Sequence, residues 1–597
     1  MPPPDADWRF FRLLLAAALA LCAAYAALVL GQASYADVQA LGRITFHHGT
    51  YQHLPVRVSA AEFSLAQRLA LGGAIGLGLL ALALAGRAGW AELMRLASEV
   101  RQALAGAGRQ LAALSPAQRW AAGLSLALLT AVRLYFSLIK SYHAEEVATY
   151  DFFVSRGLLA ASSFYPIPNN HVLSSTLGWL FYQLSPAPWF SLRLPVLLTA
   201  TAGTVALFAG LLRFGTFRAA LVGLTLFSWL QLSLYNAAAG RGYWLLMTLA
   251  GLHFLALVAR LARPAGPRVA WALLLATGIL GCYTVPSFAY VVLSSTSYLG
   301  LVFGRRRAWA ALTRTLALGA GGLAGAALLY GPLLLLSGWP LLLTNPYVRS
   351  SSWAAVGREL PAFLWFTEGI LAGQRTIGAG LFIAGMGAFI WLWRARQRVE
   401  LAPDLRRALR QLGPPAAWFV LLPLLLLAVQ RVLPPERVLL YKALFFFTLL
   451  GLLVDAWLRA HPGRGWAQLA GAGIALFVGY QTFTMHRLVL DNSRQRAHVD
   501  RAFAWLQRQP PGRVLIGVNE TALHFLFITH TRAPNAPWQL DTNSQPGVRY
   551  RYLIVAPGYA GPARPAPPAR PAYANARNEI YVLPAPGQPV PPDPAWE

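Results

Sequence analysis

The chain has 597 residues, of which 56% are hydrophobic and only 12% are charged. Soluble domains carry about 25% charged residues, so this chain has too few polar side chains to cover itself in water. The apolar residues come in blocks of about 20, the length that crosses a lipid bilayer. The composition therefore excludes a soluble globular protein and predicts an all-α polytopic membrane protein.

The formal net charge of +28 comes almost entirely from arginine. Such a charge can indicate nucleic-acid binding, but the arginines sit in short clusters between apolar blocks, as the positive-inside rule predicts for cytoplasmic loops. We therefore expect membrane lipids and no nucleic acid as partners. Cys22 and Cys282 both lie inside apolar blocks, which indicates neither a disulfide framework nor a metal site.

Residues 1–118 are predicted to form an N-terminal extension with two spanning helices. The first apolar block, 10–30, is longer than the apolar core of a signal peptide, so we interpret it as an uncleaved helix. The polar stretch 31–67 carries few arginines and is placed outside. A second span is expected at 68–84, followed by an amphipathic cytoplasmic segment at 87–118.

Residues 119–485 are predicted to form the main transmembrane core. Its first span, 120–139, leads to a long polar loop outside, and residues 171–186 are too short for a comfortable span and are interpreted as an interfacial or re-entrant piece. The remaining spans are expected at 190–212, 219–236, 241–260, 268–284, 287–303, 315–337, 378–394, 415–433, 438–457 and 466–485. The total is about thirteen crossings, an odd number that places the C-terminus outside.

Residues 486–597 are predicted to form a small extracytoplasmic α/β domain. A polar helix is expected at 491–509, and short strands at 513–518, 550–555 and 579–583. Residues 560–571 are rich in proline, alanine and arginine and are interpreted as a flexible loop.

The outer loop after the third span concentrates acidic residues in a chain that has only 22 of them. Glu145, Glu146 and Asp151 lie within seven positions, next to His143. Carboxylates at a membrane face suit general-base catalysis or metal binding. The alternative is a solvated loop that happens to be acidic.

A second polar segment follows in the same loop, with Pro168, Asn169, Asn170 and His171 just before an apolar block. The amide and imidazole groups lie close in sequence to the carboxylates and are candidates for substrate binding. Asn170 is equally compatible with a purely structural role as a helix N-cap.

Two further outer segments carry cations. Arg241 and Tyr243 lie in a short turn between two spans, where the arginine either snorkels to the interface or binds an anionic group such as phosphate. Arg437 and Lys442 lie at the start of a later span. A charge at membrane depth costs roughly 2.5–3.5 kcal/mol, so both are functional candidates, although Arg437 can also simply pair with Glu436.

Together these segments resemble the GT-C superfamily of membrane glycosyltransferases, and most closely glycosyltransferase family 39, which includes the protein mannosyltransferases and the lipid A aminoarabinose transferase. The resemblance covers roughly residues 119–485. It rests on an acidic pair after the first core helix, a Pro-Asn-Asn-His stretch, an Arg-Leu-Pro opening of the next span and a Gly-Arg-Gly-Tyr turn. These are Glu145-Glu146, Pro168–His171, Arg193–Pro195 and Gly240–Tyr243. The family pair is Asp-Glu, so the sequence leaves open which glutamate matters.

The resemblance implies a transferase that moves a sugar from a polyprenyl-phosphate donor to an acceptor hydroxyl, with inversion. Glu145 or Glu146 would be the general base, and Arg241, Arg437 and Lys442 would contact the donor phosphate. The acceptor (a glycan, a lipid or a protein) stays open, and a divalent metal is used by some relatives although nothing in the sequence demands one. The expected location is a bacterial cytoplasmic membrane, with the active site outside.

Two other functions compete with this interpretation. A transporter or flippase of lipid or polysaccharide also has many helices and polar loops, but its polar residues gather near the bilayer midplane, often in repeated halves. A scaffold that only carries the C-terminal domain leaves the charged outer residues unexplained.

Overall fold

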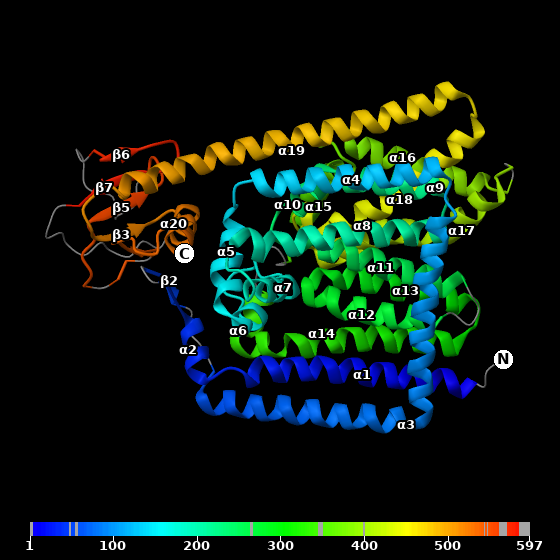
Figure 1. Ribbon diagram of the computed structural model, residues 1–597, viewed down its shortest axis with the longest axis horizontal. Helices are drawn as coiled ribbons and strands as arrows, with labels where there is room; N and C mark the ends of the chain where they lie inside the picture. Colours follow the sequence, from blue (N-terminus) through cyan, green and yellow to red (C-terminus); the bar gives the residue numbers. More distant parts are fainter. Residues whose placement is uncertain are drawn as a thin grey trace.

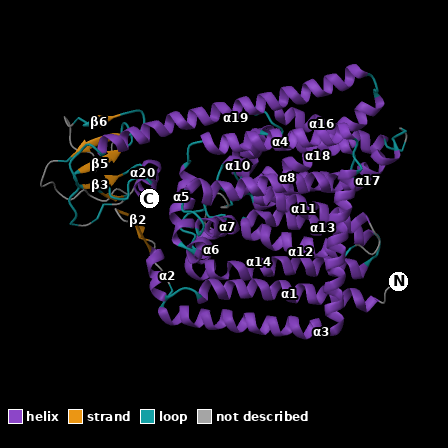
Figure 2. Cartoon of the chain, viewed as in Figure 1, coloured by secondary structure: helices purple, strands orange, loops and turns teal. Residues whose placement is uncertain are grey.

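The computed structural model describes residues 4–46, 49–53, 58–262, 267–343, 350–397, 400–542, 544–545, 547–559 and 570–583. Long helices run side by side in a bundle, and a small sheet lies beyond one end of it (Figure 1; Figure 2). Among the described residues, ten helices are long and apolar enough to cross a membrane. These spans lie in α1 (Pro4–Gly31), α3 (Ala60–Ala112), α4 (Pro116–Ile139), α8 (Leu194–Phe214), α11 (Tyr243–Ala262), α13 (Ala289–Arg305), α14 (Trp309–Leu343), α16 (Gly378–Ala395), α17 (Pro403–Gln430) and α18 (Leu440–Ala460).

The three remaining spans expected from the sequence take less regular forms. The expected span 219–236 is broken into α9 (Phe217–Trp229) and α10 (Gln231–Ala238), which meet at an angle of 66° and count as an eleventh span if taken together. The span 268–284 is α12 (Arg268–Thr284), a shorter apolar helix. The span 466–485 and the polar helix 491–509 are one continuous helix, α19 (Arg464–Leu506).

Helix α3 changes direction at Gly86, whose φ of 33° is a backbone conformation that favours glycine. Its first half runs along the bundle and its second half lies across the ends of the spans (Figure 1). Glu92 pairs with Arg95 at 2.6 Å and with Arg268 at 2.5 Å. The segment 87–118 predicted to be amphipathic is therefore helical over most of its length, and it packs against the start of α12 by ion pairs.

Short helices gather at one end of the bundle, which we call the site end. They are α5 (Ala144–Phe152), a 3₁₀ turn at Val154–Arg156, α6 (Leu158–Ser163) and α7 (Val172–Tyr182), and a π-helical turn at Trp189–Arg193 leads into α8. With 11 residues, α7 has the short length expected of the interfacial piece. The same end receives α2 (Tyr35–Gly42), α15 (Trp353–Leu371) and a 3₁₀ turn at Glu436–Leu439, and a further 3₁₀ turn, Pro286–Phe288, precedes α13.

The sheet beyond the site end combines two distant parts of the chain. Its strand order is β1-β2-β4-β3-β5-β7-β6. The hairpin of β1 (Arg43–Phe46) and β2 (Gly49–His53) comes from the loop after α1 and pairs in parallel with β4. The other strands are β3 (Arg513–Ile516), β4 (Gln539–Asp541), β5 (Tyr552–Val555), β6 (Tyr573–Ala574) and β7 (Glu579–Val582).

The small C-terminal α/β domain expected from the sequence is therefore confirmed, with three differences. The expected strands at 513–518, 550–555 and 579–583 are shorter, and 513–518 ends before α20 (Asn519–Thr531), a helix that the sequence analysis did not predict. The sheet also extends beyond the expected boundary of 486 because the β1–β2 hairpin joins it. Most of the expected flexible loop 560–571 lies outside the described residues.

We predict that the two ends of the bundle face opposite sides of the membrane. Arg508 lies exposed beside the sheet, and Arg407 lies exposed at the start of α17. Cysteine introduced by Arg508→Cys should react with a membrane-impermeant reagent from outside the cell, and cysteine introduced by Arg407→Cys should react only after permeabilisation. Cys22 and Cys282 are buried and give a low background. Reaction of Arg407→Cys in intact cells would overturn the orientation.

Candidate functional site

A cavity of about 430 Å³ opens at the site end, where α10 and α11 meet α5 and α19. Its walls combine carboxylates, arginines and apolar side chains. The lining residues include His143, Glu145, Glu146, Leu230, Tyr235, Arg241, Tyr243, Ile370, Arg375, Glu436, Arg437, Tyr480, Gln481 and Asn492. Five of the ten predicted site residues, from three separate segments of the chain, therefore border one space.

Glu145 is a partly exposed carboxylate in the wall of this cavity. Its Oε2 lies 3.0 Å from Nη1 of Arg241, its Oε1 lies 2.9 Å from Nη2 of Arg437, and the side chain is 33% exposed. Burial raises the pKa of Glu145, but the two guanidinium groups more than offset that effect, so its pKa lies below the ordinary value. Glu145 is therefore ionised and reachable at neutral pH.

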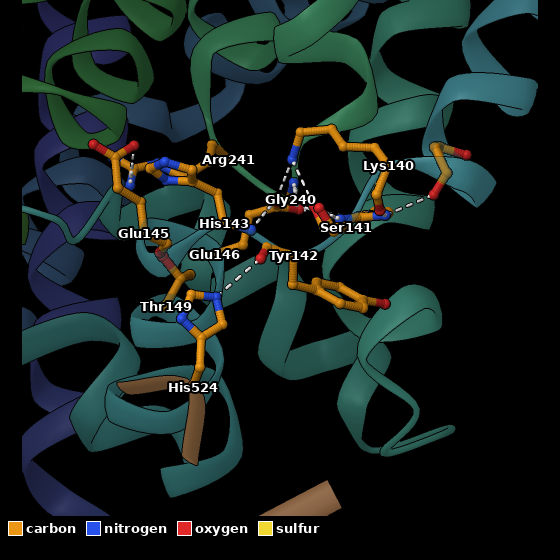
Figure 3. Close-up of polar contacts among 12 residues, drawn as sticks. Lys140, Ser141, Tyr142, His143, Glu145, Glu146, Thr149, Gly240, Arg241 and His524 are labelled. Atoms are coloured by element: carbon orange, nitrogen blue, oxygen red, sulfur yellow. Dashed lines mark hydrogen bonds and ion pairs between the residues drawn. The ribbon is translucent and has the colours of Figure 1, made fainter. Parts of the chain in front are cut away.

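Glu146 lies in a different environment, one residue further along α5. It is 1% exposed and pairs with Lys140 and with Arg193, whose Nε lies 2.9 Å from Oε1. The backbone N–H of Gly240 also donates to Oε1 at 3.0 Å, and Figure 3 shows these contacts converging on the carboxylate. Burial raises the pKa of Glu146, yet its two cationic partners hold it well below the ordinary value. Its lone pairs are taken up by the protein, which favours Glu145 as the reactive carboxylate.

The Pro-Asn-Asn-His segment positions Arg241. The side chain of Arg241 donates to Oδ1 of Asn169, and its Nη2 lies 3.1 Å from Nε2 of His171. The His171 ring meets Tyr243 edge-on at 4.6 Å. Asn170 donates instead to the carbonyl oxygens of Ala161 and Phe164 at 3.0 Å, which closes the turn after α6. Asn169 and His171 therefore act on the cavity through Arg241, and Asn170 stabilises the loop.

Two predicted site residues lie away from the cavity. Asp151 is 1% exposed and accepts a hydrogen bond from His530 of α20 at 2.9 Å; burial raises its pKa. Although Glu145, Glu146 and Asp151 are close in sequence, the pKa values of both glutamates are lowered, because their cationic partners outweigh burial and the repulsion between the two carboxylates. Lys442 is 1% exposed and pairs with Glu368 of α15. Neither residue lines the cavity, so the structure gives both of them structural partners.

Several residues of the site went unnoticed in the sequence. Lys140 precedes the acidic loop and is one of only two lysines in the chain, which was a usable signal. Arg375 lies exposed in the turn between α15 and α16, with its guanidinium over Phe366 at 4.7 Å. Gln481 of α19 accepts from the backbone N–H of Gln231 at 2.7 Å and donates to Gly373. Nothing local in the sequence indicates these last two.

Helix α20 packs directly against α5. His524 lies 3.1 Å from the carbonyl oxygen of Tyr142, as Figure 3 shows, and Phe527 contacts the rings of Tyr142 and Tyr150 at 5.3 and 5.6 Å. The helix that carries the two glutamates is therefore held between the membrane bundle and the C-terminal domain.

The acidic loop is compatible with a metal site by sequence. Among the residues that the structure describes, no group of three or more histidine, cysteine, aspartate and glutamate side chains is arranged to hold a metal ion.

No protein-family model matches the chain, and no curated protein matches it. Solved structures do resemble it. ArnT from Cupriavidus metallidurans in the apo state aligns with a TM-score of 0.50 over 78% of this chain and 98% of ArnT, at 15% identity. The chain has the fold of ArnT. The polytopic all-α membrane fold with a small C-terminal α/β domain, expected from the sequence, is therefore confirmed. The same protein bound to undecaprenyl phosphate aligns with a TM-score of 0.46 at 15% identity, over 77% of this chain and 97% of ArnT.

We predict different effects for the two glutamates on folding. Glu146→Gln leaves Lys140 and Arg193 buried without a counter-charge, which should cost about 3–5 kcal/mol and reduce the yield of monodisperse protein. Glu145→Gln removes only a partly exposed contact, for which about 1 kcal/mol is an upper bound. Thermal unfolding of both purified variants in the same detergent measures the difference.

The pH dependence provides a second readout. Because the pKa of Glu146 is lowered on folding, its stabilising contribution is present above the ordinary value of 4.5 and is lost as the pH falls below it. The stability advantage of the wild-type protein over Glu146→Gln should therefore shrink below that pH. Equal stability of the two proteins at neutral pH would show that the buried cluster does not hold the fold.

Proposed function

We propose that this protein is a glycosyltransferase that moves a sugar from a polyprenyl-phosphate donor to an acceptor hydroxyl, with Glu145 as the general base. The observation that carries the proposal is Glu145 itself, an ionised carboxylate held between two arginines in a cavity at the end of a membrane bundle. The ArnT fold supports it, since ArnT has been solved with undecaprenyl phosphate bound.

The arginines suit the anionic part of such a donor. A guanidinium carries five N–H donors, so Arg241 and Arg437 can each hold a phosphate oxygen while they still contact Glu145. Arg375 borders the same cavity and adds a third cation. These contacts stabilise the phosphate both as part of the donor and as the leaving group, when its negative charge increases.

The carboxylate then has a definite role in the reaction. Glu145 accepts the proton of the acceptor hydroxyl while the hydroxyl oxygen forms a bond to the anomeric carbon. The bond between that carbon and the phosphate oxygen breaks, and the electron pair leaves with polyprenyl phosphate. One displacement inverts the anomeric configuration. A phosphate placed on Arg241 and Arg437 also offsets their positive charge, which raises the pKa of Glu145 and makes it a better base.

The position of the cavity favours this function over transport. A transporter places its site near the bilayer midplane, whereas this cavity is lined by α5, by the turn before α11 and by the turn before α18, at one end of these helices. The arginine asymmetry of the loops places that end outside the cytoplasm, so we propose an integral protein of a bacterial cytoplasmic membrane with an outward-facing active site. The acceptor, whether glycan, lipid or protein, contributes a hydroxyl group.

Replacing Glu145 tests its role as the general base. Glu145→Gln keeps the size of the side chain and removes its proton affinity, and general-base catalysis contributes about 10²–10⁴-fold. Transfer should therefore fall by at least ~100-fold in an assay with purified protein and a polyprenyl-phosphate sugar, while the protein still binds the donor. Glu436→Gln is the matched control, because Glu436 borders the same cavity but makes no contact with Arg241. Normal transfer by Glu145→Gln would remove the main support of the proposal.

Replacing Arg437 tests the contact with the donor phosphate. Arg437→Ala should raise the KM for the donor by about 10-fold or more, because a charge-assisted contact is lost. Arg437→Lys should restore only part of the affinity, since lysine lacks the bidentate guanidinium. Arg358→Ala serves as the control, because Arg358 is exposed on α15 and does not border the cavity. If Arg437→Ala and Arg358→Ala have the same KM, Arg437 does not bind the donor.

A further inference from the structure

A second, apolar cavity lies on the other half of the bundle. It has a volume of about 410 Å³ and is lined by α4, α8, α9 and the end of α3. Its walls are mainly leucine, alanine and aromatic side chains, among them Leu126, Val205, Phe208 and Leu224. We call this cavity the apolar groove. Such walls bind hydrocarbon rather than a polar substrate.

The groove has the length of one lipid leaflet. On α4 its lining runs from Arg119 to Leu129, which corresponds to about 15 Å at 1.5 Å per helical residue. This is half of the ~30 Å hydrocarbon core. Towards the site end, Leu129 and Trp229 belong to a buried cluster with Phe136 and Met485. In the described part of the chain, no residue lines both the groove and the catalytic cavity, so the groove is not built as a path to the active site.

The other end of the groove adjoins a polar hollow of about 530 Å³, which is lined by Gln118, Thr216, Phe217, Arg218, Asp404 and Arg459 among others. The walls of the two spaces are in contact, since Phe208 of the groove packs against Phe217 of the hollow with ring centroids 6.2 Å apart. Gln118 in the hollow and Arg119 in the groove are neighbours in the chain. A molecule with an apolar chain and a polar head can therefore occupy both.

The charges around the hollow favour an anionic head. Arg459 is already bound by Asp404 at 2.8 Å and by Asp455 at 3.0 Å. Arg218 is 57% exposed, and its nearest carboxylate oxygen, on Asp455, is 3.8 Å away. Arg119 is exposed and adds a further cation at the rim. Counting these five side chains, three positive charges face two negative ones, so a phosphate brings the hollow close to neutrality.

We propose that the groove and the hollow form a binding site for one anionic glycerophospholipid from the leaflet opposite the catalytic cavity. One acyl chain lies in the apolar groove, and the headgroup phosphate lies between Arg119 and Arg218. The lipid fills a gap between α4, α8 and α9, the last of which leads through the bend at Leu230 to the cavity wall formed by α10. The site is separate from the proposed donor site and does not depend on the proposed reaction.

The groove can be filled by a single substitution. A Cβ added at Gly123 meets no atom within 4 Å, and Gly123 lines the groove. The side chain of Gly123→Leu therefore starts in open space and extends into the groove, where the acyl chain would lie. Gly72→Leu is the matched control, because Gly72 also meets no atom within 4 Å but lies exposed on α3, outside both cavities. The paired change Arg119→Gln and Arg218→Gln tests the headgroup contact.

The experiment measures binding of phosphatidylglycerol and of phosphatidylcholine to detergent-purified protein by native mass spectrometry. The wild type and Gly72→Leu should bind one phosphatidylglycerol more tightly than phosphatidylcholine. Gly123→Leu should weaken that binding by at least ~10-fold, and the double arginine variant should remove the preference between the two lipids. Unchanged binding by Gly123→Leu, or equal binding of both lipids to the wild type, would overturn the proposal. Undecaprenyl phosphate binding that is lost in Gly123→Leu would show that the carrier lipid is the occupant instead.

Discussion

The site end of the bundle depends on one buried carboxylate. Glu146 joins four segments at a single point: Lys140 at the end of α4, its own helix α5, Arg193 at the start of α8, and Gly240 in the turn before α11. Removing two cations and a carboxylate from water costs several kcal/mol per ion, and only close geometry and full hydrogen bonding repay it. Arg193 also donates to the carbonyl oxygens of Ser137 and Lys140, at 2.8 and 2.7 Å, which ties the ends of α4 and α8 together. The cluster therefore does more than stabilise the fold. It fixes the position of α5 relative to the turn before α11, so that Glu145 and Arg241 face each other.

The two neighbouring glutamates thus have different surroundings, which the sequence cannot distinguish. Glu146 holds the fold together, and Glu145 faces the cavity. Both follow the same span and both carry a lowered pKa, but the lowering has different origins and different consequences. The negative charge of Glu146 is balanced by Lys140 and Arg193, which are buried and closed to solutes. Glu145 is held by Arg241 and Arg437, two cations that also border the cavity and are available to an incoming anion. In the proposed reaction the donor phosphate takes part of this positive charge, so donor binding and base strength are coupled through the same two guanidinium groups.

The sequence predicted those features that follow from composition and local pattern. The spans of α1, α4, α8 and α11 are visible as apolar blocks, and the grouping of Glu145 with Arg241 and Arg437 follows from their expected placement on the same side of the membrane. The break between α9 and α10 was missed because both halves are apolar, and hydropathy does not report direction. Asp151 and Lys442, which the sequence predicts to bind substrate, do not line the cavity. Charge near a membrane helix has two explanations, substrate binding and a buried ion pair. Only tertiary contacts, with His530 and with Glu368, distinguish them.

The C-terminal domain shows why such contacts decide function. By sequence it is a short appendage, yet it completes its sheet with the β1–β2 hairpin from the segment between α1 and α3 and places α20 against α5. His524 and His530 bind the two ends of the segment that contains both glutamates, at Tyr142 and Asp151. Helix α19, which leads to this domain, lines the proposed active-site cavity through Tyr480, Gln481 and Asn492. A movement of the domain would therefore shift α5 and one wall of the cavity together, so the domain belongs mechanically to the site even though none of its described residues lines the cavity with a charged group.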